Sequence, residues 1–189
     1  MLTLEAMGEA AIRQLYAGQM RRDFPPSELK RLSSILEMRA RGEYDVIGAY
    51  EHGALAGYAL VYRPSQGRVA LLDYLAVEPH LRGRGVGTAL LTRLQARYRD
   101  LIDVLMIECE RPKAAPDEAE ARKRIRFYTQ AGARLTSVRI WLFEVEYSIL
   151  VLPCGAEQPK ADWAQQMLAL YRQMLPPEVF VRCVRLIRG

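Results

Sequence analysis

The spacing of apolar residues along the chain predicts helices and strands in alternation. Ile12, Leu15 and Tyr16 recur at helical spacing near the N-terminus, and the same period, with capping residues and glycine stops, marks later segments. The helices predicted on this basis cover residues 5–20, 28–41, 88–99, 117–131, 162–174 and 177–188. Runs rich in apolar and β-branched residues predict strands over residues 44–50, 55–62, 68–77, 101–108, 134–145 and 146–152.

The order of these elements is α-α-β-β-β-α-β-α-β-β, followed by a helical tail. Because hairpins alternate with βα units, we expect an α/β protein with a central mixed sheet of about six or seven strands, flanked by helices. Residues 1–152 form one predicted domain, and residues 153–189 form a helical C-terminal extension. The apolar stripe that includes Trp163, Met167 and Tyr171 must be covered by other residues, which we expect from the same domain or from a dimer partner.

The composition is that of a globular protein without a membrane segment. Half of the 189 residues are hydrophobic and 26% are charged, and apolar runs such as residues 69–72 fall well short of the ~18 residues that a spanning helix needs. Three widely spaced cysteines exclude a disulfide framework and a zinc cage, which fits a reducing compartment. The N-terminus carries no secretory leader pattern, so we expect a cytoplasmic protein.

Positive charge is concentrated in the middle of the chain. The net charge is +5, and residues 82–134 carry 12 basic and seven acidic side chains. Most of the basic residues are arginine, which suits bidentate phosphate contacts, although a solvated basic helix face would explain the excess equally. No basic run is interleaved with aromatic residues, so we expect a small phosphorylated ligand and no nucleic acid.

The most informative segment is a glycine-rich loop between a predicted strand and a predicted helix. Gly83, Gly85 and Gly87 occupy alternate positions after the strand and lead into the helix. Arg82 precedes the three glycines, and Arg84 lies between the first two. Glycines allow positive φ and a close approach of a ligand to the backbone. Free amides and the dipole at a helix start favour a pyrophosphate. The alternative is a glycine-rich connection without a ligand.

Two phosphate-binding motifs do not match this loop, and a third does. A Walker loop requires a lysine after its last glycine, but no lysine follows Gly87. The third glycine of the dinucleotide fingerprint is also missing. Arg82, Gly85 and Gly87 instead fit Arg-x-x-Gly-x-Gly, preceded by Val77-x-Pro79. This pattern resembles motif A of the GNAT superfamily of N-acetyltransferases.

A second segment supports the same resemblance. The run from Phe127 to Gly132 is similar to the Phe-Tyr-x-x-x-Gly segment that ends the next GNAT helix, with Ala133 where phenylalanine is commoner. The order of elements agrees with a GNAT fold as far as Leu152, and the tail lies outside the resemblance.

The resemblance implies a cofactor site and a reaction. In the family, the pantetheine of acetyl-CoA lies along the strand that ends here at Val77, and the pyrophosphate binds the amides of the following loop. The cofactor-binding residues carried over in this way are Leu75, Val77, Arg82, Gly83, Gly85, Val86, Gly87 and Thr88. The implied activity is direct transfer of an acetyl group from acetyl-CoA, as co-substrate, to a primary amine.

Tyr128 matches the tyrosine that protonates the leaving CoA thiolate in many family members. A phenol with an ordinary pKa of about 10 is protonated at neutral pH and can act as a general acid. The alternative is a core aromatic residue at helical spacing from Ile125.

The general base has three candidates. Glu108 and Glu110 leave the end of one predicted strand, and Asp73 shares a face of the preceding strand with Leu75 and Val77. Each can instead be an ion-pair partner of an arginine, and a water relay can replace all three. Cys109 has no histidine nearby in sequence to activate it and is interpreted as a core residue. The two histidines are unclustered, so we expect no metal site.

Two other functions share this fold. A non-catalytic acyl-CoA-binding or regulatory module would use the same loop, and an O-acyl or longer-acyl transferase would use the same chemistry. Tyr128 favours an enzyme, since a module that only binds CoA has no need for the acid. The acceptor, a small-molecule amine or a peptide amine, would be selected by residues 5–41 and the final hairpin, which carry no signature that names it.

Overall fold

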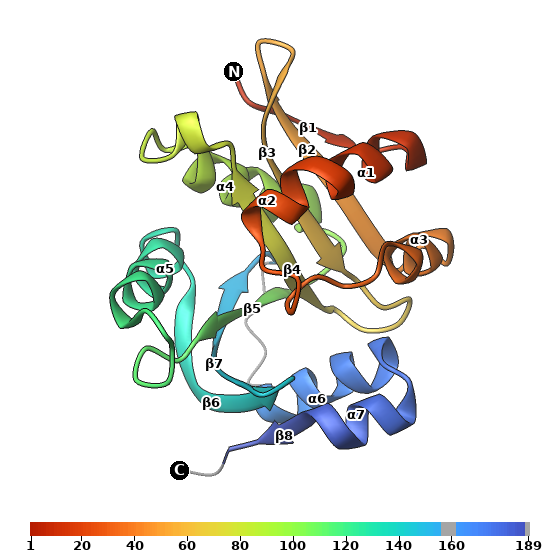
Figure 1. Ribbon diagram of the computed structural model, residues 1–189, viewed down its shortest axis with the longest axis vertical. Helices are drawn as coiled ribbons and strands as arrows, with labels where there is room; N and C mark the ends of the chain where they lie inside the picture. The colour runs from red at the N-terminus through yellow and green to blue at the C-terminus, as the bar shows by residue number, and fades with distance from the viewer. Residues whose placement is uncertain (156–161, 188–189) are drawn as a thin grey trace. The chain divides into compact units, whose positions relative to one another are not determined.

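The computed structural model describes residues 1–155 and 162–187 and confirms a mixed α/β fold (Figure 1). The hydrogen-bonded strand order is β1-β2-β3-β4-β5-β7-β6-β8. The contacts divide the chain into two units, Met1–Ser65 with Asp73–Arg93, and Gln66–Leu72 with Leu94–Gly189. Strand β4 (Val69–Val77) runs through both units, which are described in turn below.

In the first unit, the strands form an antiparallel series ahead of β4. Strand β1 (Thr3–Ala6) pairs with β2 (Tyr44–Glu51), and β2 pairs with β3 (Ala54–Tyr62) through a tight turn at His52 and Gly53. The prediction missed β1, because four residues with mostly exposed side chains carry too little alternation to reveal a strand.

The helices of the first unit differ from the prediction at their starts. The first helical segment consists of α1 (Glu9–Leu15), a π-helical turn (Tyr16–Met20) and α2 (Arg21–Asp23). Helix α3 (Leu32–Ala40) begins four residues later than predicted. The reason is Tyr74, whose hydroxyl donates to the Glu28 carbonyl at 2.7 Å and accepts from the Lys30 amide at 2.8 Å. These bonds hold the backbone before α3 in a non-helical path.

In the second unit, β4 pairs in parallel with β5 (Val104–Glu110), and the other pairs are antiparallel. Strands β6 (Arg134–Leu142) and β7 (Val145–Pro153) meet at a tight turn in which Phe143 and Glu144 have positive φ. Strand β8 (Val184–Leu186) pairs with β6. The prediction extended the last helix through these residues, since three residues show no strand period of their own.

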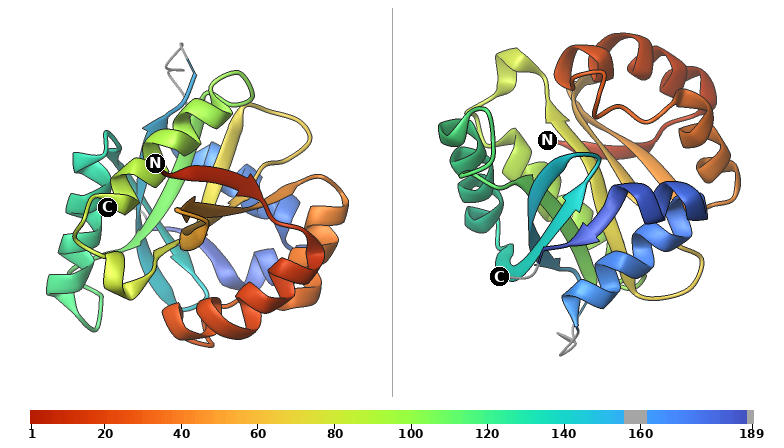
Figure 2. Two further views of the ribbon diagram at one scale, coloured as in Figure 1. Left: turned by 90° about the horizontal axis from the view of Figure 1, so that it is seen from above. Right: turned by 60° about the horizontal axis from the view of Figure 1, so that its bottom comes forward.

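In the part of the chain that the structure describes, four helices follow the glycine-rich loop. Helix α4 (Val86–Tyr98) begins in the first unit and ends in the second. The second unit also holds α5 (Glu118–Gln130), α6 (Trp163–Met174) and α7 (Pro177–Cys183). Helix α6 packs against β6, β8 and α7, as the blue segments in the right-hand view of Figure 2 show. Within the described residues, no helix is both long and apolar enough to cross a membrane.

Candidate functional site

The glycine-rich loop connects the end of β4 to the start of α4 by two left-handed glycines. After a short 3₁₀ turn (Pro79–Leu81), Gly83 has φ +75° and Gly85 has φ +81°. Nothing lies within 4 Å of a Cβ built at either glycine, so the backbone conformation, and not crowding, requires glycine there. The chain can therefore turn sharply and begin α4 at Val86.

The start of α4 favours an anion. The first amides of an α-helix have no acceptor within the helix, and the macrodipole adds positive potential there. Gly87 and Thr88 lie in this first turn, which contains no acidic residue, and Arg84 next to it is exposed and forms no ion pair within the described part of the chain. Backbone N–H groups and charge therefore converge where the sequence predicts a pyrophosphate.

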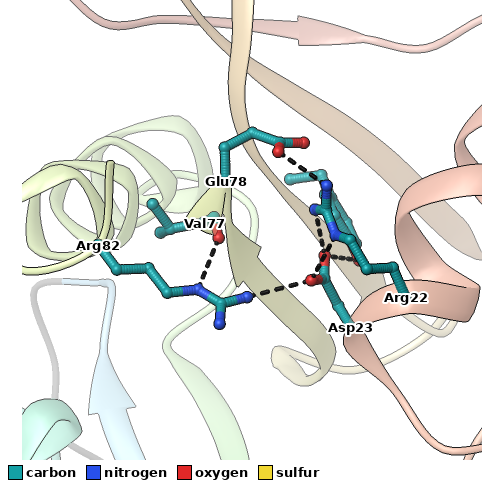
Figure 3. A network of polar contacts seen from close by, with 6 residues as sticks. Arg22, Asp23, Val77, Glu78 and Arg82 are labelled. Atoms are coloured by element: carbon teal, nitrogen blue, oxygen red, sulfur yellow. Dashed lines mark hydrogen bonds and ion pairs between the residues drawn. The ribbon is translucent and has the colours of Figure 1, made fainter. Parts of the chain in front are cut away.

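Arg82 points back to the strand (Figure 3). Its Nε donates to the Val77 carbonyl at 3.0 Å, and its Nη2 donates to Oδ1 of Asp23 at 3.1 Å. Because Val77 and Arg82 are five residues apart, the first bond closes the loop into a ring. The sequence had suggested Arg82 only as a source of charge beside the phosphate.

Asp23, the last residue of α2, is the centre of a polar network that the sequence did not reveal. Its carboxylate is 3% exposed and also accepts from Arg22 Nε at 3.1 Å, from Arg22 Nη2 at 3.0 Å and from the Tyr58 hydroxyl at 3.0 Å. Arg22 in turn bonds Glu78 at 2.9 Å. Burial, followed by Asp23, raises the pKa of Tyr58 well above its ordinary value. No local pattern links Asp23 to a loop more than fifty residues away.

Asp73 lies in β4 on the half-buried face that it shares with Leu75 and Val77. Both of its oxygens have partners, since Lys30 Nζ lies 2.8 Å from Oδ1 and the Tyr44 hydroxyl donates to Oδ2. Burial, and then the Asp73 charge, raise the pKa of Tyr44. The Asp73 carboxylate, one of the three candidate bases, is 5% exposed, and its charge is paired with that of Lys30.

Tyr128 lies on the buried face of α5, in the second unit. Its side chain is 7% exposed, and its ring lies 4.9 Å from the ring of Phe127. Burial, followed by the neighbouring Cys109, raises the pKa of Tyr128 well above its ordinary value, so the phenol stays protonated at neutral pH. Burial also raises the pKa of Cys109 to about 12, which leaves its thiol a poor nucleophile.

The two glutamates of β5 have different partners. The Tyr171 hydroxyl lies 2.7 Å from both carboxylate oxygens of Glu108, whereas Glu110 forms a 3.5 Å ion pair with Arg124. Tyr171 is 1% exposed and comes from α6. The sequence analysis grouped it with an apolar stripe, although a buried tyrosine normally needs a partner for its hydroxyl.

The second unit also contains an open hollow of about 540 Å³ between α5 and the neighbouring strands. It is lined mainly by basic and apolar side chains, among them Arg111, Arg122 and Arg126. Arg111 is paired with Glu146 and Arg122 with Glu118. None of the residues predicted for the site lines this hollow. In the described residues, His, Cys, Asp and Glu form no group of three that could hold a metal ion.

Comparison with known proteins identifies an acetyltransferase. The model of the acetyltransferase (GNAT) family matches residues 10–133, and the chain belongs to this family. The resemblance noted in the sequence is thereby confirmed, and acetyl-CoA is the acetyl donor of the class. No curated protein sequence matches the chain.

Solved structures agree on the fold. A GNAT acetyltransferase from Bacteroides thetaiotaomicron has a TM-score of 0.71 at 18% identity, covering 89% of this chain and 96% of its own. The ribosomal-protein-S18-alanine N-acetyltransferase of Escherichia coli has a TM-score of 0.63 at 18% identity, covering 85% and 99%. Spermidine N-acetyltransferase of Vibrio cholerae, in complex with CoA and spermine, has a TM-score of 0.62 at 13% identity, covering 81% and 95%.

Proposed function

We propose that the protein transfers an acetyl group directly from acetyl-CoA to a primary amine. The observation that carries this proposal is the loop at the end of β4, where two left-handed glycines deliver the chain into a 13-residue helix with no acidic residue in its first turn. Amides at such a helix start suit the pyrophosphate of CoA, and family membership supplies the reaction class.

The cofactor residues act mainly through the backbone. The amides of Gly83, Gly85, Val86, Gly87 and Thr88 bind the pyrophosphate, and the strand edge from Leu75 to Val77 holds the pantetheine. Val77 and Val86 thus matter by position, while Arg82 shapes the loop through its side chain. The half-buried state of Leu75 and Val77 supports this assignment, since a ligand can reach that face of β4.

Acetyl transfer needs one base and one acid. The amine must lose a proton before its nitrogen attacks the thioester carbonyl; the carbon–sulfur bond then breaks, and the CoA thiolate takes up a proton. Tyr128 supplies that proton in this proposal, which its protonated state supports. Glu108, Glu110 or a water removes the first proton. The paired oxygens of Asp73 support a structural role for the third candidate.

The acceptor is an amine on a small molecule or on a peptide. The similar structures include one enzyme named for a ribosomal-protein alanine and one for spermidine, so both classes belong in a screen. We assign residues 1–152 to the catalytic domain and residues 153–189 to an extension, and we place the protein in the cytoplasm, with a homodimer as a further proposal.

Release of CoA thiol tests the proposal. Purified protein is incubated with acetyl-CoA and with polyamines, amino acids, aminoglycosides or lysine and alanine-terminal peptides, and free thiol is measured. At least one amine should raise thiol release above the rate without acceptor, and mass spectrometry should find that amine heavier by one acetyl group. Acetyl-CoA that neither binds nor reacts with any amine would contradict the proposal.

A further inference from the structure

The buried carboxylate of Asp23 connects the N-terminal helical segment to the glycine-rich loop. Its Oδ1 accepts from Arg82 at 3.1 Å, and the same carboxylate is bonded by Arg22 and Tyr58. A carboxylate this deeply buried is retained only when charged and polar partners compensate its lost hydration. The link to Arg82 is therefore part of a compensated cluster and not an incidental surface contact.

Arg82 needs both of its acceptors to fix the loop. The guanidinium is a rigid planar fork, so Nε and Nη2 together define its orientation when one bonds Val77 and the other bonds Asp23. Gly83 and Gly85 come soon after Arg82, and neither has a side chain that could hold its left-handed backbone in place. The position of the backbone amides that bind the pyrophosphate thus depends on Arg82, the residue just before them.

We propose that Asp23 is a positioning residue for acetyl-CoA: it holds Arg82 against the Val77 carbonyl, and Arg82 fixes the loop whose amides bind the pyrophosphate. The inference rests on the proposed function and adds a residue from outside the loop to its cofactor site. It also assigns Arg82 the role of a brace, because its fork is engaged by protein acceptors in the structure.

The two roles of Arg82 predict opposite effects of one substitution. Asp23→Asn removes a negative charge near an anion site, and if Arg82 were a phosphate ligand, releasing it would strengthen acetyl-CoA binding. If Arg82 is a brace, losing the charge-assisted bond loosens the loop and weakens binding by about tenfold or more. The sign of the change therefore decides between them.

The experiment is isothermal titration of the full chain with acetyl-CoA, together with steady-state kinetics. We expect Asp23→Asn to raise Kd and the KM for acetyl-CoA about tenfold while kcat at saturation stays within about twofold. Arg82→Lys keeps the charge but cannot reach both acceptors, so it should weaken binding to a similar degree. The double variant should cost little more than either single one. Unchanged or tighter binding by Asp23→Asn would overturn the inference.

Two controls separate positioning from loss of folding. Asp103→Asn removes another aspartate bonded by an arginine, Arg68 at 2.8 Å, and should leave acetyl-CoA affinity unchanged. Thermal unfolding without ligand reports the stability of each variant. If Asp23→Asn does not fold, Arg82→Lys decides instead: that side chain is 56% exposed, and a lysine that served as a phosphate ligand would keep the affinity, whereas loss of the brace would lower it about tenfold. Wild-type protein that binds no acetyl-CoA would overturn the proposed function and this inference together.

Discussion

The glycine-rich loop of the first unit and the polar residues of the second unit are specified in different ways. The loop depends on backbone conformation, and the sequence motif that reveals it lies within the dozen residues from Val77 to Thr88. The candidate acid and bases of the second unit depend on side chains that meet across long sequence separations, as Tyr171 and Glu108 do over 63 residues. A backbone site is thus more readable from sequence than a side-chain site.

Gly85→Asp is expected to have the largest effect on the site that depends on backbone conformation. The left-handed φ of +81° strains any side chain, and a carboxylate at the start of α4 would compete with the pyrophosphate for the same amides. We expect the variant to lose acetyl-CoA binding completely. Wild-type protein should gain about 2.7 kcal/mol of stability when acetyl-CoA is at 100 times its Kd, whereas the variant should gain none.

Gly42→Asp is the matched control for that variant. Gly42 ends α3 with φ +74°, and a Cβ there also meets open space, so the backbone strain is the same. This variant should lose intrinsic stability but keep the full rise in Tm with acetyl-CoA. Equal Tm shifts in Gly85→Asp and wild type would show that the ligand does not use this loop.

The second prediction tests the side-chain site through Tyr128→Phe. Loss of the phenol should lower kcat by about 10²–10⁴-fold, the scale of a missing general acid, with little change in acetyl-CoA affinity. Phe127→Leu alters the adjacent packing without removing a hydroxyl and should keep most of the activity. The comparison uses kcat and Kd on one preparation of each variant. Full turnover in Tyr128→Phe would make the residue structural.

A smaller effect is expected from Tyr171→Phe. The change removes the hydroxyl that lies 2.7 Å from both Glu108 oxygens. If Glu108 is the base, kcat/KM should fall about tenfold, because a hydrogen bond that orients its carboxylate is lost. Glu118→Gln, which removes the surface partner of Arg122, should leave kcat/KM unchanged. An unchanged kcat/KM with lowered stability in Tyr171→Phe would assign the Tyr171–Glu108 pair to folding alone.

Much of the fold could be predicted because long elements carry strong periodicity. The buried β4 and the amphipathic α5 and α6 appear near their predicted positions. Strands β1 and β8 escaped because four and three residues cannot display a period. The late start of α3 depends on Tyr74, which lies 44 residues beyond Lys30 in sequence. Local patterns cannot contain such information.

The same distinction holds at the site. Arg82 was identified from its motif, but its partner Asp23 was not, since nothing near Asp23 in sequence points to a loop 59 residues away. Asp73 was identified as a candidate base that could instead be the ion-pair partner of an arginine, and its partners are Lys30 and Tyr44. The sequence could thus indicate that a charged side chain would have a partner, whereas only the fold shows which residue that partner is.

The last prediction concerns stability at alkaline pH. Burial raises the pKa of Tyr44, Tyr58, Tyr74 and Tyr128, and it raises the pKa of Cys154 to about 11. Below about pH 8 these groups are mostly protonated in both the folded and the unfolded chain, so they leave stability nearly independent of pH; the thiol of the unfolded chain ionises first, and the phenols follow near pH 10. Above that, the unfolded chain releases protons that the folded chain retains. The free energy of unfolding should therefore fall as pH rises, by about 1.4 kcal/mol per pH unit for each such group.

Tyr58→Phe tests this prediction for a single tyrosine of the first unit. Phenylalanine cannot ionise, so between pH 10 and 12 the variant should lose stability less steeply than wild type, by about 1.4 kcal/mol per pH unit, whatever the missing hydrogen bond to Asp23 costs at neutral pH. Urea unfolding followed by circular dichroism at several pH values gives both slopes. Comparing slopes removes the constant offset between the two proteins. Parallel slopes would mean that the Tyr58 hydroxyl has its ordinary pKa in the folded protein. Its burial and its hydrogen bond to the Asp23 carboxylate would then not keep it protonated.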